Sequence, residues 1–284
     1  MTQRDNLFFA VGSPKSGTTF LQRMLNMHPE VSCPSEQQIR MLRAAIDEVF
    51  DSYQEVLQRV DDSTGGQGAP KLRLGTRSRA FRDVVLRLSI DFARGKPIHG
   101  LNDNEPFQEL PRYDEQFDHP RIVVILRDPV DIAVSAWRHS HRLARLYPDK
   151  AKMHMSVLQN PKGSLEGFVE KVVHGYRNLA SKAVDYAAER DNIALVRYEA
   201  LVADTAAELT RVLSFLGADT DPAIVDGIAM ASSKEAMATA SKSPGFFGVG
   251  KDAEPPVRLP DDFRQSMRER WLSPQLEEIG YRRD

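Results

Sequence analysis

A short segment with two glycines and one lysine is the part of this sequence best suited to chemistry. It reads Gly-Ser-Pro-Lys-Ser-Gly-Thr-Thr-Phe over residues 12–20, between an apolar run, Leu7 to Val11, and an apolar helical pattern, Phe20 to Met27. A strand, a tight turn and a helix N-terminus direct backbone N–H groups and the positive end of a helix dipole at one point. The segment therefore predicts a loop that binds a phosphate or sulfate group.

The lysine of this loop has an unusual position. In nucleoside-triphosphate loops of the pattern G-x-x-x-x-G-K-[ST], lysine follows the second glycine. Here Thr18 occupies that place, and the lysine lies inside the turn as Lys15. Lysine carries a compact cation, so Lys15 is suited to neutralise the negative charge of a phosphate that acts as a leaving group in a transfer reaction. Further backbone and hydroxyl donors are expected from Ser16, Gly17, Thr18 and Thr19.

A second candidate anion site follows another apolar run. Residues 122–126 are Ile-Val-Val-Ile-Leu, Arg127 comes next, and Ser135 lies eight positions further on. An arginine fork binds phosphate through two parallel hydrogen bonds, and a serine adds one donor. The pattern predicts that both side chains bind one anion. The alternative is that Arg127 pairs with Asp128 at the strand end and that Ser135 only packs.

These segments together resemble the sulfotransferases that use 3′-phosphoadenosine 5′-phosphosulfate (PAPS). Residues 14–19 resemble the 5′-phosphosulfate loop of that family, and Arg127 with Ser135 resembles its 3′-phosphate site. Phe20 stands where cytosolic members carry an adenine-stacking tryptophan, although a core position is an equal alternative. Tyr198, in a Tyr-Glu-Ala-Leu segment, is similar to the family's residue that contacts adenine.

The resemblance extends to a glycine-containing loop near the C-terminus. Residues 245–251, Gly-Phe-Phe-Gly-Val-Gly-Lys, keep a G-x-x-G-x-x-K frame that closes over the 3′-phosphate in the family. This implies binding roles for Gly248 and Lys251. The family's arginine two residues before the first glycine is absent, since Ser243 stands there, and Lys242 or Lys251 is expected to replace it.

The candidate general base comes from a third segment. Residues 28–36, His-Pro-Glu-Val-Ser-Cys-Pro-Ser-Glu, are similar to a stretch of tyrosylprotein sulfotransferases that ends in the catalytic glutamate, which implies this role for Glu36. Burial would raise its pKa toward the operating pH. Alternatively, Glu36 is a first-turn partner of a helix dipole. Cytosolic members use a histidine where this chain has Glu105, and Asp103 and His99 are nearby competitors.

Composition limits the partners. The 284 residues carry a formal net charge of -2, which gives no electrostatic footprint for nucleic acid. A run on one helical pattern is locally basic, and it predicts a solvated face or a surface that attracts an anionic acceptor. It contains Arg138, His139, His141, Arg142 and Arg145. The single cysteine, Cys33, excludes an intramolecular disulfide, and no apolar run has the length of a signal or membrane segment, so we expect a cytoplasmic protein.

The elements that must position these residues follow an alternating pattern. Strands separated by amphipathic helices predict an α/β fold, with a P-loop-type parallel sheet covered by helices on both faces. We expect a single domain over residues 1–284, a flexible connection near 61–75 and an irregular insertion near 147–163. Asp128 and Pro129 predict the start of a helix that reaches Trp137. The predicted strands are Leu7 to Val11, Pro97 to Leu101, Arg121 to Leu126 and Ile193 to Val196.

The resemblance and the candidate residues predict a PAPS-dependent sulfotransferase. It would move a sulfuryl group to a hydroxyl or phenol of a small-molecule or lipid acceptor, release adenosine 3′,5′-bisphosphate and need no metal. The alternatives are a P-loop kinase that uses Mg-ATP, with Asp128 as the metal holder, and a protein that binds a nucleotide without chemistry. The acceptor pocket is expected between the helix at Gln37 to Tyr53, the segment Asn102 to Tyr113, the insertion and the Phe246-Phe247 loop.

Overall fold

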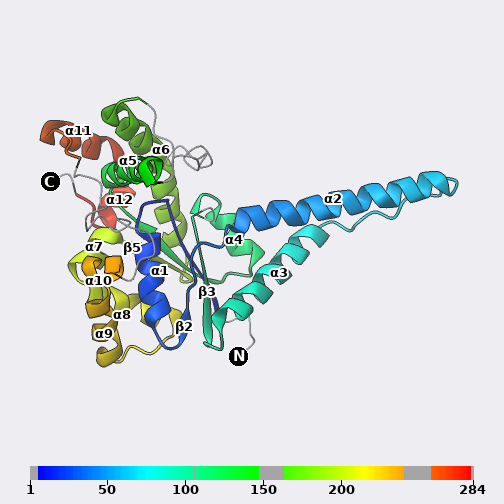
Figure 1. Cartoon of the computed structure of the whole chain (residues 1–284), viewed down its shortest axis with the longest axis horizontal. Coiled ribbons are helices and arrows are strands. Elements are labelled where there is room, and N and C mark those ends of the chain that lie inside the picture. The colour runs from blue at the N-terminus through cyan, green and yellow to red at the C-terminus, as the bar shows by residue number, and fades with distance from the viewer. Residues whose placement is uncertain (1–5, 105–106, 147–162, 240–256, 283–284) are drawn as a thin grey trace.

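The computed structural model describes residues 6–104, 107–146, 163–239 and 257–282, and it contains a five-stranded parallel sheet in the order β2-β3-β1-β4-β5 (Figure 1). This sheet confirms the predicted α/β fold class. The strands are β1 (Leu7–Gly12), β2 (Val31–Ser32), β3 (Ile98–Asp103), β4 (Arg121–Leu126) and β5 (Ile193–Arg197).

The strand register brings several strand ends to one edge of the sheet. Val11 of β1 lies beside Asp103 of β3 and beside Val124 of β4. Leu126 of β4 in turn lies beside Arg197 of β5. Residues that directly follow these strands therefore gather at the carboxyl edge, where open parallel sheets bind their ligands.

Side chains of the sheet alternate between two hydrophobic cores. In β1, Leu7, Phe9 and Val11 join one core, and Phe8 and Ala10 join the other. The first core is covered by α3 (Thr76–Ala93), α4 (Leu110–Gln116), α5 (Pro129–Leu146), α6 (Leu165–Ala188), α11 (Asp261–Trp271) and α12 (Pro274–Glu278). The second is covered by α1 (Thr18–Met27), α7 (Tyr198–Ala203), α8 (Thr205–Leu216), α9 (Pro222–Ala231) and α10 (Lys234–Thr239).

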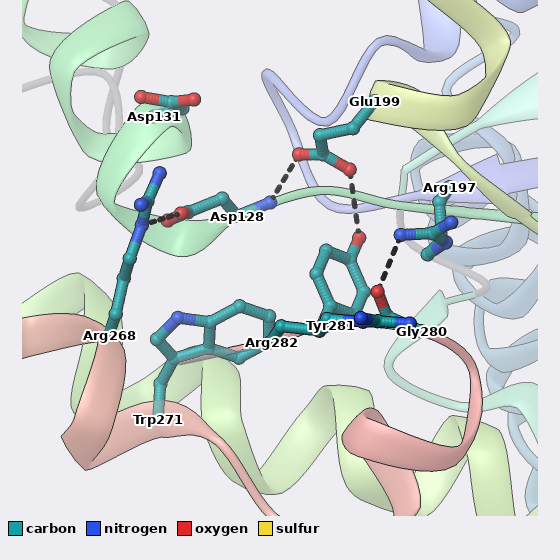
Figure 2. A pocket seen from close by; sticks show the side chains of 9 residues that line it. All are labelled: Asp128, Asp131, Arg197, Glu199, Arg268, Trp271, Gly280, Tyr281 and Arg282. Carbon is teal, nitrogen blue, oxygen red and sulfur yellow. Dashed lines mark hydrogen bonds and ion pairs between the residues drawn. The ribbon is translucent and has the colours of Figure 1, made fainter. Parts of the chain in front are cut away.

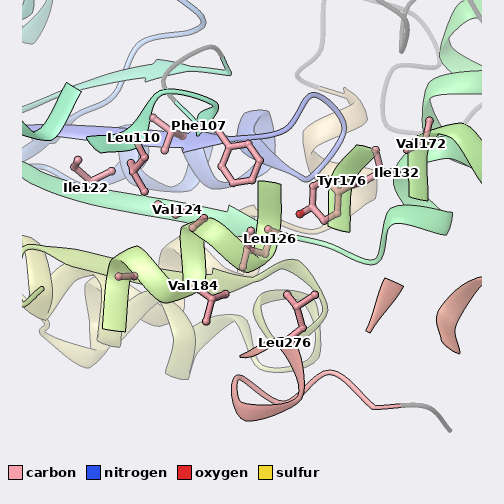
Figure 3. Packing of buried hydrophobic residues seen from close by; sticks show 14 of the residues in the cluster. Phe107, Leu110, Ile122, Val124, Leu126, Ile132, Val172, Tyr176, Val184 and Leu276 are labelled. Carbon is pink, nitrogen blue, oxygen red and sulfur yellow. The ribbon is translucent and has the colours of Figure 1, made fainter. Parts of the chain in front are cut away.

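Figure 3 shows how the first core fixes the end of β4. Val124 and Leu126 of β4 belong to one buried cluster with Tyr176 and Val184 of α6 and with Leu276 of α12. The end of β4 is thus packed on one side against the long helix α6 and against α12 near the C-terminus. A well-packed strand end gives the next residue in the chain a fixed starting point.

Helix α5 begins as predicted but is longer. The Asp128 carboxylate accepts a hydrogen bond from the N–H of Val130, 2.8 Å away, and caps the helix. The helix does not end at Trp137 and continues to Leu146, so the basic residues after Trp137 are helical. The predicted insertion near 147–163 lies outside the described residues except at its last position.

The second helix, α2 (Ile39–Ser63), leaves the body of the molecule. Only Ile39 of this helix is buried, and Figure 1 shows the rest projecting away from the sheet with α3 returning beside it. Residues 64–75, part of the connection predicted as flexible, join α2 to α3 without a helix or strand. We call α2 and residues 64–75 the arm. Within the described residues, no helix is long and apolar enough to cross a membrane.

Candidate functional site

The loop after β1 has the tight geometry that its glycines predict. Lys15 and Gly17 both have positive φ, 71° and 106°, and Gly17 precedes the first residue of α1. The Ser16 hydroxyl donates to the carbonyl of Ser13 at 2.7 Å. A Cβ atom at Gly17 would lie 2.4 Å from the ring of Tyr198, so only glycine fits there. The loop thus packs directly on the segment that follows β5.

Positive charge is concentrated around Lys15. Although part of the residue is exposed, protein surrounds its ammonium group, and this burial, with the charges of Arg142 and Arg127, lowers the pKa of Lys15 to about 7. Glu36 partly opposes the shift. Arg142 itself is buried, with 3% of its surface exposed. Three cations that crowd one place stabilise a bound anion, since an anion relieves their mutual repulsion.

Arg127 lies beside the loop, as its place at the end of β4 predicts. One guanidinium nitrogen donates to the carbonyl of Lys15 at 3.0 Å, and the group lies over the ring of Tyr198 at 4.3 Å. Its Nε atom is buried without a hydrogen-bond partner. Such an atom costs about 1–3 kcal/mol, which an oxygen of a ligand would recover. The alternative ion pair with Asp128 does not form, because Asp128 pairs with Arg268.

Two aromatic residues border the same loop. The rings of Phe20 and Tyr198 meet edge to face with centroids 6.0 Å apart, and both side chains are half-buried. Phe20 packs against the second core and also has an accessible part. Ser135 is half-buried on α5, and Arg142 follows it by two turns on the same helix. The structure brings Phe20 and Tyr198 together beside the loop, and it places Ser135 on α5.

Glu36 is connected to the loop through one amide. Asn104 donates a short hydrogen bond to Glu36 Oε1, and the hydroxyl of Thr18 donates to Asn104 Oδ1 at 3.2 Å. Desolvation and the charge of Asp103 raise the pKa of Glu36, whereas Asn104 and Lys15 lower it. Although the Glu36 side chain is exposed at the rim of the site, and not buried as predicted, its raised pKa is a property of a general base.

The alternative bases have other partners. Asp103 Oδ2 accepts the N–H of Ile39 at 2.5 Å, so this residue rather than Glu36 caps the start of α2. His99 is buried in β3 with Nδ1 3.0 Å from the Ser89 hydroxyl. Glu105 lies outside the described residues. The same holds for Lys242, Ser243 and the whole predicted loop with Gly248 and Lys251.

The segment before Glu36 contains residues that stabilise the fold. His28 is buried, its Nδ1 accepts the N–H of Glu30 at 3.1 Å, and its Nε2 therefore donates to the carbonyl of Asp219 at 2.9 Å. Cys33 is buried, which raises the pKa of its thiol. These contacts fix the path of the chain from α1 through β2 toward Glu36.

The sequence motifs do not identify two residues that lie at the site, Asn104 and Arg142. Asn104 directly follows β3, and this position next to a strand end is the signal that marks it. Arg142 belongs to the basic helical run, which pointed to a solvated face as one of two readings. Its spacing of seven from Ser135, two helical turns, is the signal that places both on one side of α5.

A cavity of about 320 Å³ is lined by residues that include Asp128, Glu199 and Arg268 (Figure 2). Asp128 Oδ2 accepts from Arg268 at 3.0 Å, and Glu199 accepts from the N–H of Asp128 at 2.8 Å and from the Tyr281 hydroxyl at 3.2 Å. Burial and the charge of Asp131 raise the pKa of Asp128. Asp128 is thus committed to α5 and α11, which argues against its role as the metal holder of a kinase.

The sheet order and the helices on its two faces define a parallel α/β protein, in which a lysine-bearing loop and further cations lie at the strand ends. The model of the sulfotransferase family matches residues 8–222, and the chain belongs to this family.

Curated relatives match over part of their length. A protein-tyrosine sulfotransferase 1 of Danio rerio is 27% identical over 124 residues, 43% of this chain and 32% of that protein. The nodulation protein NoeE of Sinorhizobium fredii is 25% identical over 235 residues, 78% of this chain and 52% of that protein. The chain therefore spans about a third to a half of these relatives.

Solved structures share the fold over nearly the whole chain. A sulfotransferase from Alicyclobacillus acidocaldarius is 18% identical with a TM-score of 0.52, covering 96% of this chain and 94% of its own. Mouse sulfotransferase SULT7A1 complexed with PAP is 15% identical with a TM-score of 0.53, covering 97% and 81%. A retinol dehydratase in complex with androsterone and inactive cofactor PAP is 16% identical with a TM-score of 0.50, covering 98% and 83%.

Proposed function

We propose that this sulfotransferase uses PAPS as its donor and transfers the sulfuryl group to a hydroxyl or phenol of a small-molecule or lipid acceptor. The observation that carries the proposal is the convergence of Lys15, Arg127 and Arg142 beside the loop, with Glu36 tied to the same loop through Asn104. This arrangement supplies cations for two phosphates and a carboxylate for the acceptor proton.

The donor would be held at its two ends. Residues 13–19 and the start of α1 suit the 5′-phosphosulfate, because the loop and the helix dipole attract negative charge. Arg127 suits the 3′-phosphate, since its buried Nε lacks an acceptor, and Ser135 adds a hydroxyl. Phe20 and Tyr198 present ring surfaces for the adenine between these groups. Gly248 and Lys251 are proposed to complete the 3′-phosphate site.

Transfer would proceed in line. The acceptor oxygen forms a bond to sulfur while the bond from sulfur to the 5′-phosphate oxygen breaks, and the electron pair of that bond stays on the phosphate. Lys15 is placed to stabilise this developing charge, and Glu36 takes the acceptor proton. Arg142 adds positive potential at the same point. The proposal needs no metal, because these cations occupy the role that magnesium has in phosphoryl transfer.

The acceptor class rests on two considerations. A retinol dehydratase of the same fold was solved with androsterone, a small apolar molecule with a hydroxyl group. Asp103 holds Ile39, the first residue of α2, three positions after Glu36, and the rest of α2 projects away from the sheet (Figure 1), so we place the acceptor near the sheet rather than along the arm. A compact hydroxyl compound suits such a site.

Calorimetric titration with adenosine 3′,5′-bisphosphate tests the donor site. We expect binding without magnesium, and a loss of about 10- to 100-fold in Arg127→Ala, as the removal of a charge-assisted contact predicts. Arg87→Ala is the matched control, because Arg87 is exposed on α3 and pairs with Asp91 along the helix. Turnover of PAPS against a panel of alcohols and phenols then tests the transfer step.

Three outcomes contradict the proposal in different ways. Binding of Mg-ATP alone would overturn the donor and favour the kinase. Unchanged affinity in Arg127→Ala would remove this residue from the phosphate site. Strong bisphosphate binding with no turnover across the acceptor panel would indicate a nucleotide-binding protein without chemistry.

A further inference from the structure

One side of α2 exposes a row of large apolar side chains along the arm. Val49, Tyr53, Val56 and Val60 are 68%, 53%, 46% and 54% exposed. We call these four residues the α2 stripe. Their spacing of four, three and four residues is that of the a and d positions of a coiled coil. The row has the pattern of a helix-pairing seam.

The α2 stripe continues a row that starts in the core. Leu42 and Ile46 precede it at the same spacing and pack against the first core. The contacts within the arm use another side of the helix, where Asp51 pairs with Arg77 and Gln54 donates to the carbonyl of Pro70 at 3.0 Å. At 3.6 residues per turn, Asp51 and Gln54 lie more than 90° from the stripe. The return segment of the arm therefore leaves the stripe exposed.

We propose that the α2 stripe packs antiparallel against the same stripe of a second copy of this chain, and that this contact forms a two-fold dimer. The spacing of four, three and four reads the same from either end. An antiparallel alignment consequently places Val49 of one copy against Val60 of the other, and Tyr53 against Val56. Such self-complementarity is what an isologous interface requires.

The residues beside the stripe agree with this alignment. Ala45 and Ser52 lie on its open flank and are small enough for a second helix to approach closely. Glu48 and Arg59 lie on the same flank near opposite ends of the stripe, so the antiparallel arrangement brings Arg59 of each copy next to Glu48 of the other. In a parallel arrangement the two flanks would lie on opposite sides of the seam, so this ion pair would not form. Charge thus selects the antiparallel pairing.

The size of the contact sets the expected strength. The stripe extends over residues 49–60, roughly 18 Å of helix at 1.5 Å per residue. Two helices in contact over this length bury less than the roughly 1,200–2,000 Å² of a stable complex, so the dimer is weak and reversible. Acidic side chains around the arm disfavour an anionic membrane as the occupant, namely Glu48, Asp51, Glu55 and Asp62.

Sedimentation velocity of the full chain tests the proposal, from about 1 to about 200 µM, because dimerisation follows mass action. We expect a dimer fraction that rises with concentration and a dissociation constant at least tenfold higher in Val56→Asp, since a carboxylate would be buried in the seam. Gln58→Asp is the matched control, because Gln58 is exposed on the other side of the same helix. Circular dichroism checks that both variants keep their helices.

A charge reversal tests the direction of the pairing. Glu48→Arg should weaken the dimer, and adding Arg59→Glu to the same chain should restore it. A wild-type protein that stays monomeric at the highest concentration would overturn the proposal, as would a dimer indifferent to Val56→Asp. A dimer that Val56→Asp disrupts and the charge pair leaves unchanged would overturn the antiparallel alignment. A monomer that binds phosphatidylcholine vesicles through Val56 would assign the stripe to a membrane.

Discussion

Arg127 and Asp128 are neighbours in the chain, yet they belong to two regions with different charge balance, because acidic and basic side chains line the cavity in equal number. On the loop side, Arg127 joins Lys15 and Arg142, burial and the two arginine charges lower the pKa of Lys15, and the Nε atom of Arg127 lacks a hydrogen-bond partner. On the cavity side, Asp128 is paired with Arg268. The same alternation occurs after β5, where Tyr198 borders the loop and Glu199 borders the cavity.

The difference between the loop side and the cavity distinguishes a region that can bind a ligand from a region that stabilises the fold. Charged side chains line both regions, but in the cavity Asp128 and Glu199 accept hydrogen bonds from protein donors, whereas on the loop side three cations lie together and the buried Nε of Arg127 has no hydrogen-bond partner. Structural ion pairs satisfy each other, and binding sites keep capacity for their ligand. The following predictions act on one region or the other.

The largest effect is expected from Lys15→Met, which keeps the aliphatic stem and removes the charge. Because this charge would act mainly on the departing phosphate, turnover should fall by about a thousandfold, with less than about tenfold loss of bisphosphate affinity. Steady-state rates with an acceptor from the screen and calorimetry measure the two quantities. Near-normal turnover would remove Lys15 from the mechanism.

A smaller loss is expected from Glu36→Gln. Turnover should fall by about a hundredfold while bisphosphate affinity stays the same, because a general base acts only on the acceptor proton. In the wild type, the rate should fall as pH drops through the raised pKa of Glu36, and this limb should disappear in the variant. If Glu105→Gln is inactive and Glu36→Gln active, the base is Glu105.

Bisphosphate affinity should depend on pH through Lys15. Its pKa is about 7 in the free protein, and a bound anion raises it, so binding takes up a proton above pH 7. Affinity should therefore decrease with rising pH by up to about tenfold per unit, since the phosphate groups, with a second pKa near 6, stay ionised. Calorimetry from neutral to mildly alkaline pH should show this slope in the wild type and a flat profile in Lys15→Met.

The smallest effect on catalysis is expected in the cavity. Arg268→Met removes the partner of Asp128, and because Arg268 is partly exposed, the expected loss of stability is only about 1–2 kcal/mol. Turnover should stay within about threefold, which thermal unfolding and initial rates test together. A loss of turnover as large as that of Lys15→Met would erase the distinction between the two regions.

The sequence was sufficient for the fold because its signals are local. Apolar runs at β1 and β4 predict buried parallel strands, and Lys15 and Arg127 directly follow such strands, so their convergence depends only on sheet order. β2 has two residues, too few for a periodic signal. The roles of the predicted site residues stay predictions.

The remaining features depend on tertiary contacts. The pattern of Leu42, Ile46 and Val49 predicts an apolar helix face but does not say what covers it, and the structure buries only its start. Arg142 belongs to a run that fits a solvated face, and its burial depends on how α5 packs beside the loop. Periodicity gives the face of a helix, whereas the partner of that face comes from the rest of the fold.

The arm is anchored to the sheet at one end only, within the described residues, so it can tilt about that end. Asp103 holds the first residue of α2, Ile39, three positions after Glu36, so the point about which α2 would tilt lies close in the chain to the candidate base. A rigid helix of 25 residues is about 37 Å long, and a tilt of roughly 5° at its root moves the tip by about 3 Å. A contact that restrains the far end of α2 therefore limits the tilt of its first turn. Such a contact would restrict the movement of the Glu36 carboxylate.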